Sequence, residues 1–108
     1  MANDIGVQAI IEAAKNVKDD ELWNLDVTLA ALIFPYMKKF REVHIGHPSS
    51  ITDKQWDEIL DDIVWSFENY EISNPYSPAT QHKEFEEYGD RVTKGIDLFA
   101  KWFGSLWI

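Results

Sequence analysis

The chain of 108 residues contains no cysteine. This absence excludes a disulfide scaffold, a thiolate metal site and a cysteine nucleophile. Positive charge is also scarce, because ten Lys and Arg residues stand against nineteen Asp and Glu residues, for a net charge of −9. Since nucleic acid is a polyanion, we expect no direct nucleic-acid binding. The same field suits a partner with a basic surface, and it also keeps a protein soluble.

Long apolar runs are missing as well. The longest, residues 29–34, is far shorter than the ~20 residues that cross a bilayer. The N-terminus has neither the basic nor the apolar region of a secretory signal. We therefore expect a cytoplasmic protein without membrane contact. The length fits one domain, residues 1–108.

Four stretches show helical periodicity, and none is typical of a strand. We expect helices over residues 4–17, 25–43, from a cap at Thr52 to about residue 70, and 80–107. The second, which Asn24 is expected to cap, is apolar on every side, as is typical of a helix packed on several sides. Pro35 predicts a kink in it, because proline lacks an N–H and clashes with the preceding turn. The sequence thus predicts an all-α, four-helix array around a central, proline-kinked apolar helix.

Two further signals concern helix starts and helix contacts. Thr52 and Gln55 have the spacing of a capping box, and Ile51 and Trp56 have that of a hydrophobic staple. Gly95 lies on or beside the apolar stripe of the last helix, where a neighbouring helix could approach closely.

The third helix carries a tryptophan outside its apolar face. At ~100° per residue, Trp65 lies about 180° from Trp56, among carboxylates. Tryptophan is enriched at binding hot spots, and surrounding charges would steer a basic partner. We therefore predict a partner-binding set of five residues: Trp65, Asp61, Glu58, Glu68 and Asp57. The alternative is that another helix, or the loop with two prolines at residues 75 and 78, covers the ring.

Catalytic and metal-binding patterns are weak. The paired carboxylates share one helix face, whereas acid–base chemistry needs two different environments across a cleft. The close pair His44 and His47 lacks further ligands at a metal-site spacing. The five glycines are scattered, so no phosphate-binding loop is predicted. We expect no enzyme activity, no metal and no cofactor.

Several motifs occur together in order: DDELWNLDVTLA, then Pro35, then GHP, WDEILDDIVWSFE and finally GIDLFAKWFGSLW. In this combination the chain resembles a family of small uncharacterised all-α proteins encoded by bacteriophages and prophages. The likeness covers residues 19–107. It implies a phage-encoded accessory protein and transfers no catalytic residue.

Three hypotheses of function follow. The first is a non-enzymatic binding protein that acts stoichiometrically on a host protein with a basic surface, as a counter-defence or host-takeover inhibitor. The second is a protein that sequesters a signalling nucleotide, with aromatic rings to stack the base and cations to meet phosphate: Trp23, Tyr36, Lys38, Lys39 and Arg41. The third is a virion or assembly component that acts as a homo-oligomer. The C-terminal WFGSLWI either closes the core or forms an exposed patch for dimerisation.

Overall fold

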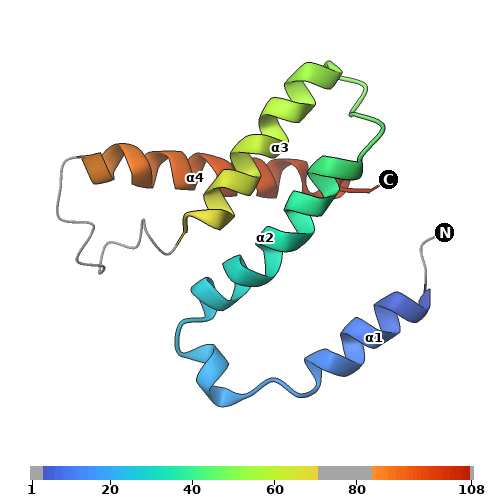
Figure 1. Ribbon diagram of the computed structural model, residues 1–108, viewed down its shortest axis with the longest axis vertical. Helices are drawn as coiled ribbons and strands as arrows, with labels where there is room; N and C mark the ends of the chain where they lie inside the picture. The colour runs from blue at the N-terminus through green and yellow to red at the C-terminus, as the bar shows by residue number, and fades with distance from the viewer. Residues whose placement is uncertain (1–3, 71–83, 108) are drawn as a thin grey trace.

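The computed structural model describes residues 4–70 and 84–107. Within them the chain forms four α-helices and no strand, so the predicted all-α class is confirmed (Figure 1). The elements are α1 (Asp4–Ala14), the 3-10 turn η1 (Asp19–Leu22), α2 (Leu25–Val43), α3 (Asp53–Glu68), α4 (Glu84–Trp102) and the 3-10 turn η3 (Phe103–Ser105). In the described part, none of the helices combines the length and the apolar character needed to span a bilayer.

The centre of the fold is α3. It packs against α2 on one side and α4 on the other, and it supplies the fully buried side chains Trp56, Leu60, Ile63 and Ser66. The prediction that the second helix is central is wrong, because α3 and not α2 lies between the other two helices. α2 fully buries only Ala30 and Met37, and Ile33, Phe34 and Phe40 pack partly buried against the same core. α2 runs through Pro35 as a single helix, and the kink remains a prediction.

The contact between α3 and α4 alternates aromatic pairs with a close backbone approach. Trp56 meets Trp102 edge to face at 5.7 Å between ring centroids, and Phe67 meets Phe99 in the same way at 5.1 Å. One turn before Phe99 on α4 lies Gly95, which is buried against Asp62 and Ser66 of α3. The predicted close approach at this glycine is therefore confirmed.

The start of α3 is built as its sequence predicts. The backbone N–H of Gln55 donates to Thr52 Oγ1 at 3.1 Å, and the Thr52 N–H donates to Gln55 Oε1 at 2.9 Å. Trp56 is buried, and Ile51 packs against the same core. Asn24 stands at the N-cap position of α2, but its side chain makes no capping bond. Asn24 thus has the predicted position, but the prediction that its side chain caps this helix is wrong.

The ends of two helices differ from the prediction. α1 stops at Ala14, three residues before the expected end. The last helix leaves α-helical geometry after Trp102 and tightens into η3, where Gly104 favours the change. Leu106 still packs against the core, whereas Phe103 is exposed. The expected start at residue 80 and the loop with prolines at 75 and 78 lie outside the described residues.

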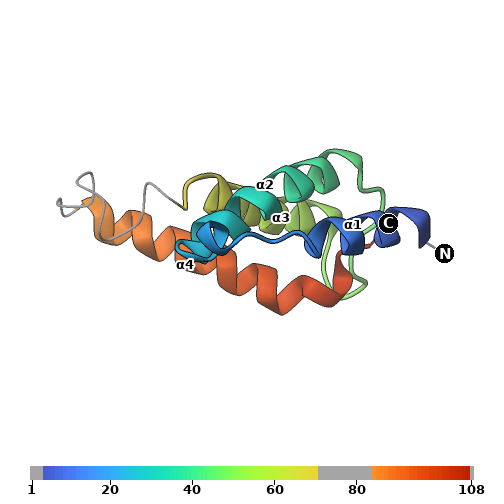
Figure 2. The same ribbon diagram turned by 90° about the horizontal axis from the view of Figure 1, so that it is seen from below.

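α1 stands apart from the other helices. Figure 1 shows it well separated from α2, to which it is joined through η1, and Figure 2 shows α4 lying beneath the layer of α2 and α3. The molecule is correspondingly flat, with principal extents of 47 × 40 × 19 Å. The packed body consists of α2, α3 and α4, and α1 is an arm beside it.

Candidate functional site

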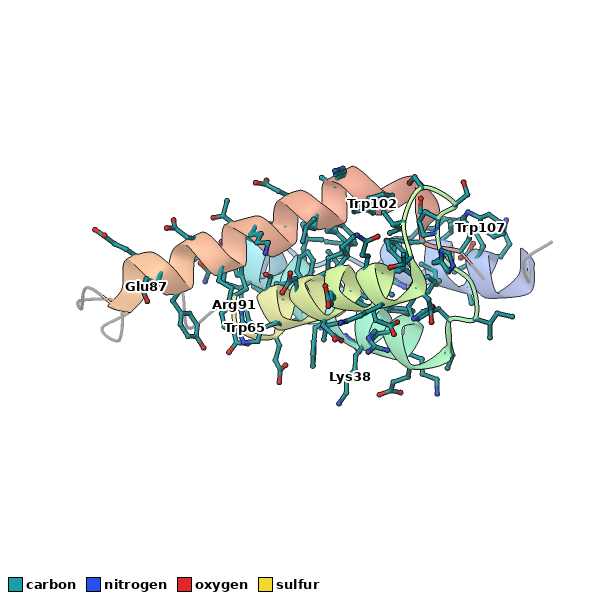
Figure 3. All side chains as sticks on the ribbon, turned by 90° about the horizontal axis from the view of Figure 1, so that it is seen from above. Lys38, Trp65, Glu87, Arg91, Trp102 and Trp107 are labelled. Carbon is teal, nitrogen blue, oxygen red and sulfur yellow. The ribbon has the colours of Figure 1, made fainter. Side chains whose placement is uncertain are left out.

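Trp65 lies at the contact between α3 and α4. The guanidinium carbon of Arg91 is 3.7 Å from the centroid of its ring, and the Tyr88 ring lies at 4.8 Å on a tilted plane. Figure 3 shows Arg91 reaching from α4 to Trp65. The ring is half-buried. Of the two predicted alternatives, cover by another helix therefore matches the structure.

The reason is that α3 is covered on two sides. The sequence pattern placed the apolar face around Trp56, but α4 packs further round the helix, over Ser66 and Trp65. Ser66 is fully buried although it is polar, and its hydroxyl donates to the Arg91 carbonyl at 3.1 Å. Tyr88 adds a bond from its hydroxyl to Asn69 Oδ1 at 2.9 Å. The periodicity of the apolar residues alone does not show this second face.

Two carboxylates of the predicted set are paired within the chain. Arg41 Nε donates to Asp61 Oδ1 at 2.7 Å, and its guanidinium lies 3.5 Å from Asp57. The hydrogen bond to Asp61 raises the pKa of Arg41. His44 Nε2 lies 2.7 Å from the same Asp57 oxygen, with its side chain only 7% exposed. These pairs tie α2 to α3, which leaves less of their charge for a partner.

The other two carboxylates of the set point to solvent. Glu58 and Glu68 are exposed on α3, and neither forms an ion pair within the described part of the chain. They remain available to a basic partner. The structure thus separates the predicted partner-binding set into paired carboxylates, free carboxylates and a covered ring.

The nucleotide-binding set does not converge on one place. Trp23 and Tyr36 are 86% and 62% exposed, while Arg41 turns toward the carboxylates of α3. Lys38 lies near the Phe34 ring, at 6.0 Å, and Figure 3 shows it pointing away from the body. No cradle for a base and its phosphate forms among these residues.

The histidine pair does not form a shared site either. His47 Nδ1 lies 2.9 Å from the Pro48 carbonyl oxygen, whereas His44 faces α3. A different group, His44, Asp53 and Asp57, brings one potential ligand atom each within 4.8 Å. The positive Arg41 beside Asp57 opposes a cation there. The group is accounted for as a hydrogen-bonded link between α2 and α3.

The most prominent exposed apolar surface includes only Trp23 and Tyr36 of the residues predicted for a site. Among the residues that the structure describes, eleven of the fourteen exposed large apolar side chains lie in the N-terminal part. On α1 and just after it they form the arm face: Val7, Ile10, Ile11 and Val17. Along α2 they form the outer stripe: Leu25, Leu29, Leu32, Tyr36 and Val43. Leu22 and Trp23 lie between the two.

The sequence signal for this surface was the apolar character of α2 on every side. Such a helix needs more than one packing partner, and the described chain supplies α3 along one side and the short turn η1 beside it. The outer stripe is the side left over.

The C-terminal end shows a mixed outcome. Leu106 packs on the core, while Trp107 is 77% exposed. A cavity of about 210 Å³ opens there between the loop after α2 and the chain end; it is lined by Ile45, Gly46, His47, Pro48, Trp56, Ser105 and Trp107. The segment both closes the core and leaves aromatic surface.

Comparison of the chain with protein-family models, with curated proteins and with solved structures found no match.

Proposed function

We propose that the protein is a small non-enzymatic binding protein that acts by stoichiometric protein–protein contact. The observation that carries this proposal is the uncovered apolar surface of the arm face, η1 and the outer stripe. A full aliphatic side chain has an area of about 60–120 Å² and a full aromatic one about 150–250 Å². Multiplied by their exposed fractions, the areas of these eleven side chains add up to an exposed surface on the order of 700 Å². The largest apolar patch on a typical monomer is about 300–600 Å². This total is divided between the arm face, η1 and the outer stripe, and apolar surfaces exposed on several elements are typical of a protein that binds a partner.

The acidic charge lies mostly in the other part of the chain. Residues 1–44 contain seven acidic and five basic residues, a net charge of −2, whereas residues 45–108 contain twelve and five, a net charge of −7. Exposed carboxylates such as Glu58 and Glu68 belong to this second part. A field of this sign steers a basic partner toward α3 and α4 and increases the association rate.

In this proposal the partner of the acidic part is a host protein with a basic surface. The likeness of the sequence motifs to phage-encoded proteins supports a role in counter-defence or host takeover. The protein would act in the cytoplasm of the infected cell. An assembly component that acts as an oligomer is the second candidate, and it is favoured by the same uncovered apolar surface.

Capture from infected host cells tests the proposal. The stripe variant Leu29→Glu/Leu32→Glu places two charges in the outer stripe, and the charge-matched control Thr93→Glu/Ala100→Glu places two at exposed positions of α4. We expect wild type and control to retain a protein in near-stoichiometric amount, and the stripe variant to lose it. Circular dichroism would check that all three keep their helical content.

A second pair of baits tests the acidic part. Glu58→Lys/Glu68→Lys should release a basic host protein without affecting contacts made by the outer stripe. The proposal is contradicted if wild type retains no protein, or if the stripe variant retains the same proteins as wild type.

A further inference from the structure

We propose that the outer stripe of α2 binds α1 of a second copy of this chain, in a two-fold exchange of arms. The inference rests on the proposed function, since it names the partner of the apolar surface. It leaves the acidic part of each chain facing outward.

The first argument is the stability of α1. Isolated helices shorter than about 12–15 residues are marginal in water, and α1 has 11 residues. It makes no extensive contact with another described element. Val7, Ile10 and Ile11 are 49%, 57% and 44% exposed. A helix this short needs a surface to cover its apolar side, and its own chain does not provide one.

The second argument is the matching pattern of the two helices. The outer stripe follows a four–three–four spacing from Leu25 to Tyr36 and continues to Val43. This is the spacing of a seam that packs against another helix by knobs into holes. On α1, Val7, Ile10 and Ala14 follow the complementary three–four spacing. Both surfaces are suited to a helix rather than to a flat partner.

The length of α1 also fits the length of the outer stripe. At ~1.5 Å per residue, α1 spans about 16 Å and the stripe from Leu25 to Val43 about 27 Å. The whole of α1 therefore fits on the stripe. The order of 700 Å² exposed by each chain is close to the roughly 800 Å² per partner of a stable interface.

The fourth argument concerns the route between α1 and α2. Thr28 Oγ1 donates to the Glu21 carbonyl at 3.2 Å, and the Lys18 N–H donates to Glu21 Oε2 at 3.4 Å. η1 also packs against α2. These contacts hold η1 against α2, and Figure 1 shows α1 lying away from its own α2. The stripe is thus open to the arm of another molecule.

Charge permits this association. A net charge of −9 opposes self-association in general, but residues 1–44 carry only −2 of it. Charges separated by more than about 8–10 Å are largely screened at physiological salt. An interface built from the N-terminal parts therefore brings together the least charged regions of the two chains.

Sedimentation of the purified chain tests for the second copy. We expect a mass of twice 12.6 kDa at high concentration that falls to 12.6 kDa on dilution. Leu29→Glu/Leu32→Glu should weaken the dimer at least 100-fold, and Thr93→Glu/Ala100→Glu should leave it within about twofold of wild type. A wild-type chain that stays monomeric at millimolar concentration overturns the inference.

Cross-linking tests which surfaces meet. Because the chain has no cysteine, Ile10→Cys and Leu29→Cys each introduce a unique thiol. Mixing the two single variants, one of them carrying a mass tag, with a short bis-maleimide should give the mixed covalent dimer. Thr93→Cys mixed with Ile10→Cys should not. Coupling only within a single chain, in the double variant Ile10→Cys/Leu29→Cys, shows that each arm folds on its own α2 and overturns the exchange.

The two proposals can fail separately. If the purified chain is monomeric but its stripe variant loses a captured host protein, the exchange of arms is ruled out and the binding function is kept. If the chain is monomeric and its stripe variant captures the same proteins as wild type, both the exchange of arms and the proposed binding function are ruled out.

Discussion

At the scale of single residues, Gly95 is a point of close approach between α3 and α4. A Cβ placed on it would lie 2.6 Å from the Asp62 carbonyl oxygen and would overlap the side chain of Ser66. Gly89, in the same helix, has no atom within 4 Å of such a Cβ. The two glycines of α4 therefore have opposite roles.

We expect Gly95→Ala to destabilise the protein by about 1–3 kcal/mol, because the added methyl overpacks the contact. Gly89→Ala is the matched control. It should stabilise the protein by up to ~1 kcal/mol, since alanine favours the helix. Urea denaturation of the two variants measures both effects. If Gly95→Ala instead stabilised the protein as much as Gly89→Ala does, the two helices would separate easily at this point.

Tyr70, just after α3, and Asp26, at the start of α2, form a hydrogen-bonded pair. The Tyr70 hydroxyl donates to Asp26 Oδ2 at 2.6 Å. This bond lowers the pKa of Asp26, and together with burial it raises the pKa of Tyr70. The lowered carboxyl pKa gives stability that is present above about pH 4 and lost as the pH falls through the folded value. The raised phenol pKa gives stability that is present below about pH 10 and lost as the pH rises further.

Tyr70→Phe removes both contributions. We expect the variant to be less stable than wild type at neutral pH, with the difference shrinking toward acid and toward alkaline pH. The measurement is the urea midpoint of both proteins from pH 3 to pH 11. A constant difference over that range would mean that the hydrogen bond is not coupled to either titration.

Residue-scale predictability depended on whether the signal was local. Gly95 was predicted because a glycine on an apolar stripe has few other uses. The cover over Trp65 was not assigned, because Arg91 and Tyr88 reach it from a helix that is distant in sequence. A charged residue stacked on a ring leaves no periodic pattern that a sequence shows.

At the scale of elements, the two helix starts at Thr52 and Asn24 make a natural comparison. Thr52 accepts a bond from the Gln55 N–H, whereas the Asn24 side chain makes no capping bond. We expect Thr52→Ala to cost about 1 kcal/mol, and Asn24→Ala to cost a few tenths of that at most. Thermal unfolding of both variants decides the point. A cost at Asn24 equal to that at Thr52 would show that the cap of α2 forms in solution.

The helices themselves were predictable, and their arrangement was only partly so. The Thr52 to Gln55 box fixed the start of α3 through bonds between near neighbours. The position of α2 was misjudged because apolar character shows how much a helix could bury, not how much its chain covers. Which of its sides stays open depends on where α4 and α1 lie, and no local signal sets that.

At the scale of the whole molecule, the chain divides into an apolar, nearly neutral part and an acidic part. If two copies exchange arms, backbone amides of α1 should exchange hydrogen quickly in the monomer and slowly in the dimer. We expect protection at residues 4–14 to rise at least tenfold between micromolar and several hundred micromolar chain, while α4 changes little. Hydrogen exchange followed by mass spectrometry measures this. Concentration-independent exchange in α1 would contradict the arm exchange.

Trp23 lies between α1 and α2, within the nearly neutral part, with 86% of its surface exposed, whereas Trp56 is 1% exposed. The protein thus carries its own optical reporter. In the free chain Trp23 should emit at long wavelength and be quenched readily by acrylamide, a neutral quencher that the negative field does not repel. Association that covers η1 should shift the emission to the blue and slow the quenching. Trp23→Phe should abolish the shift, so that association at this surface can be followed by intrinsic fluorescence, without a label.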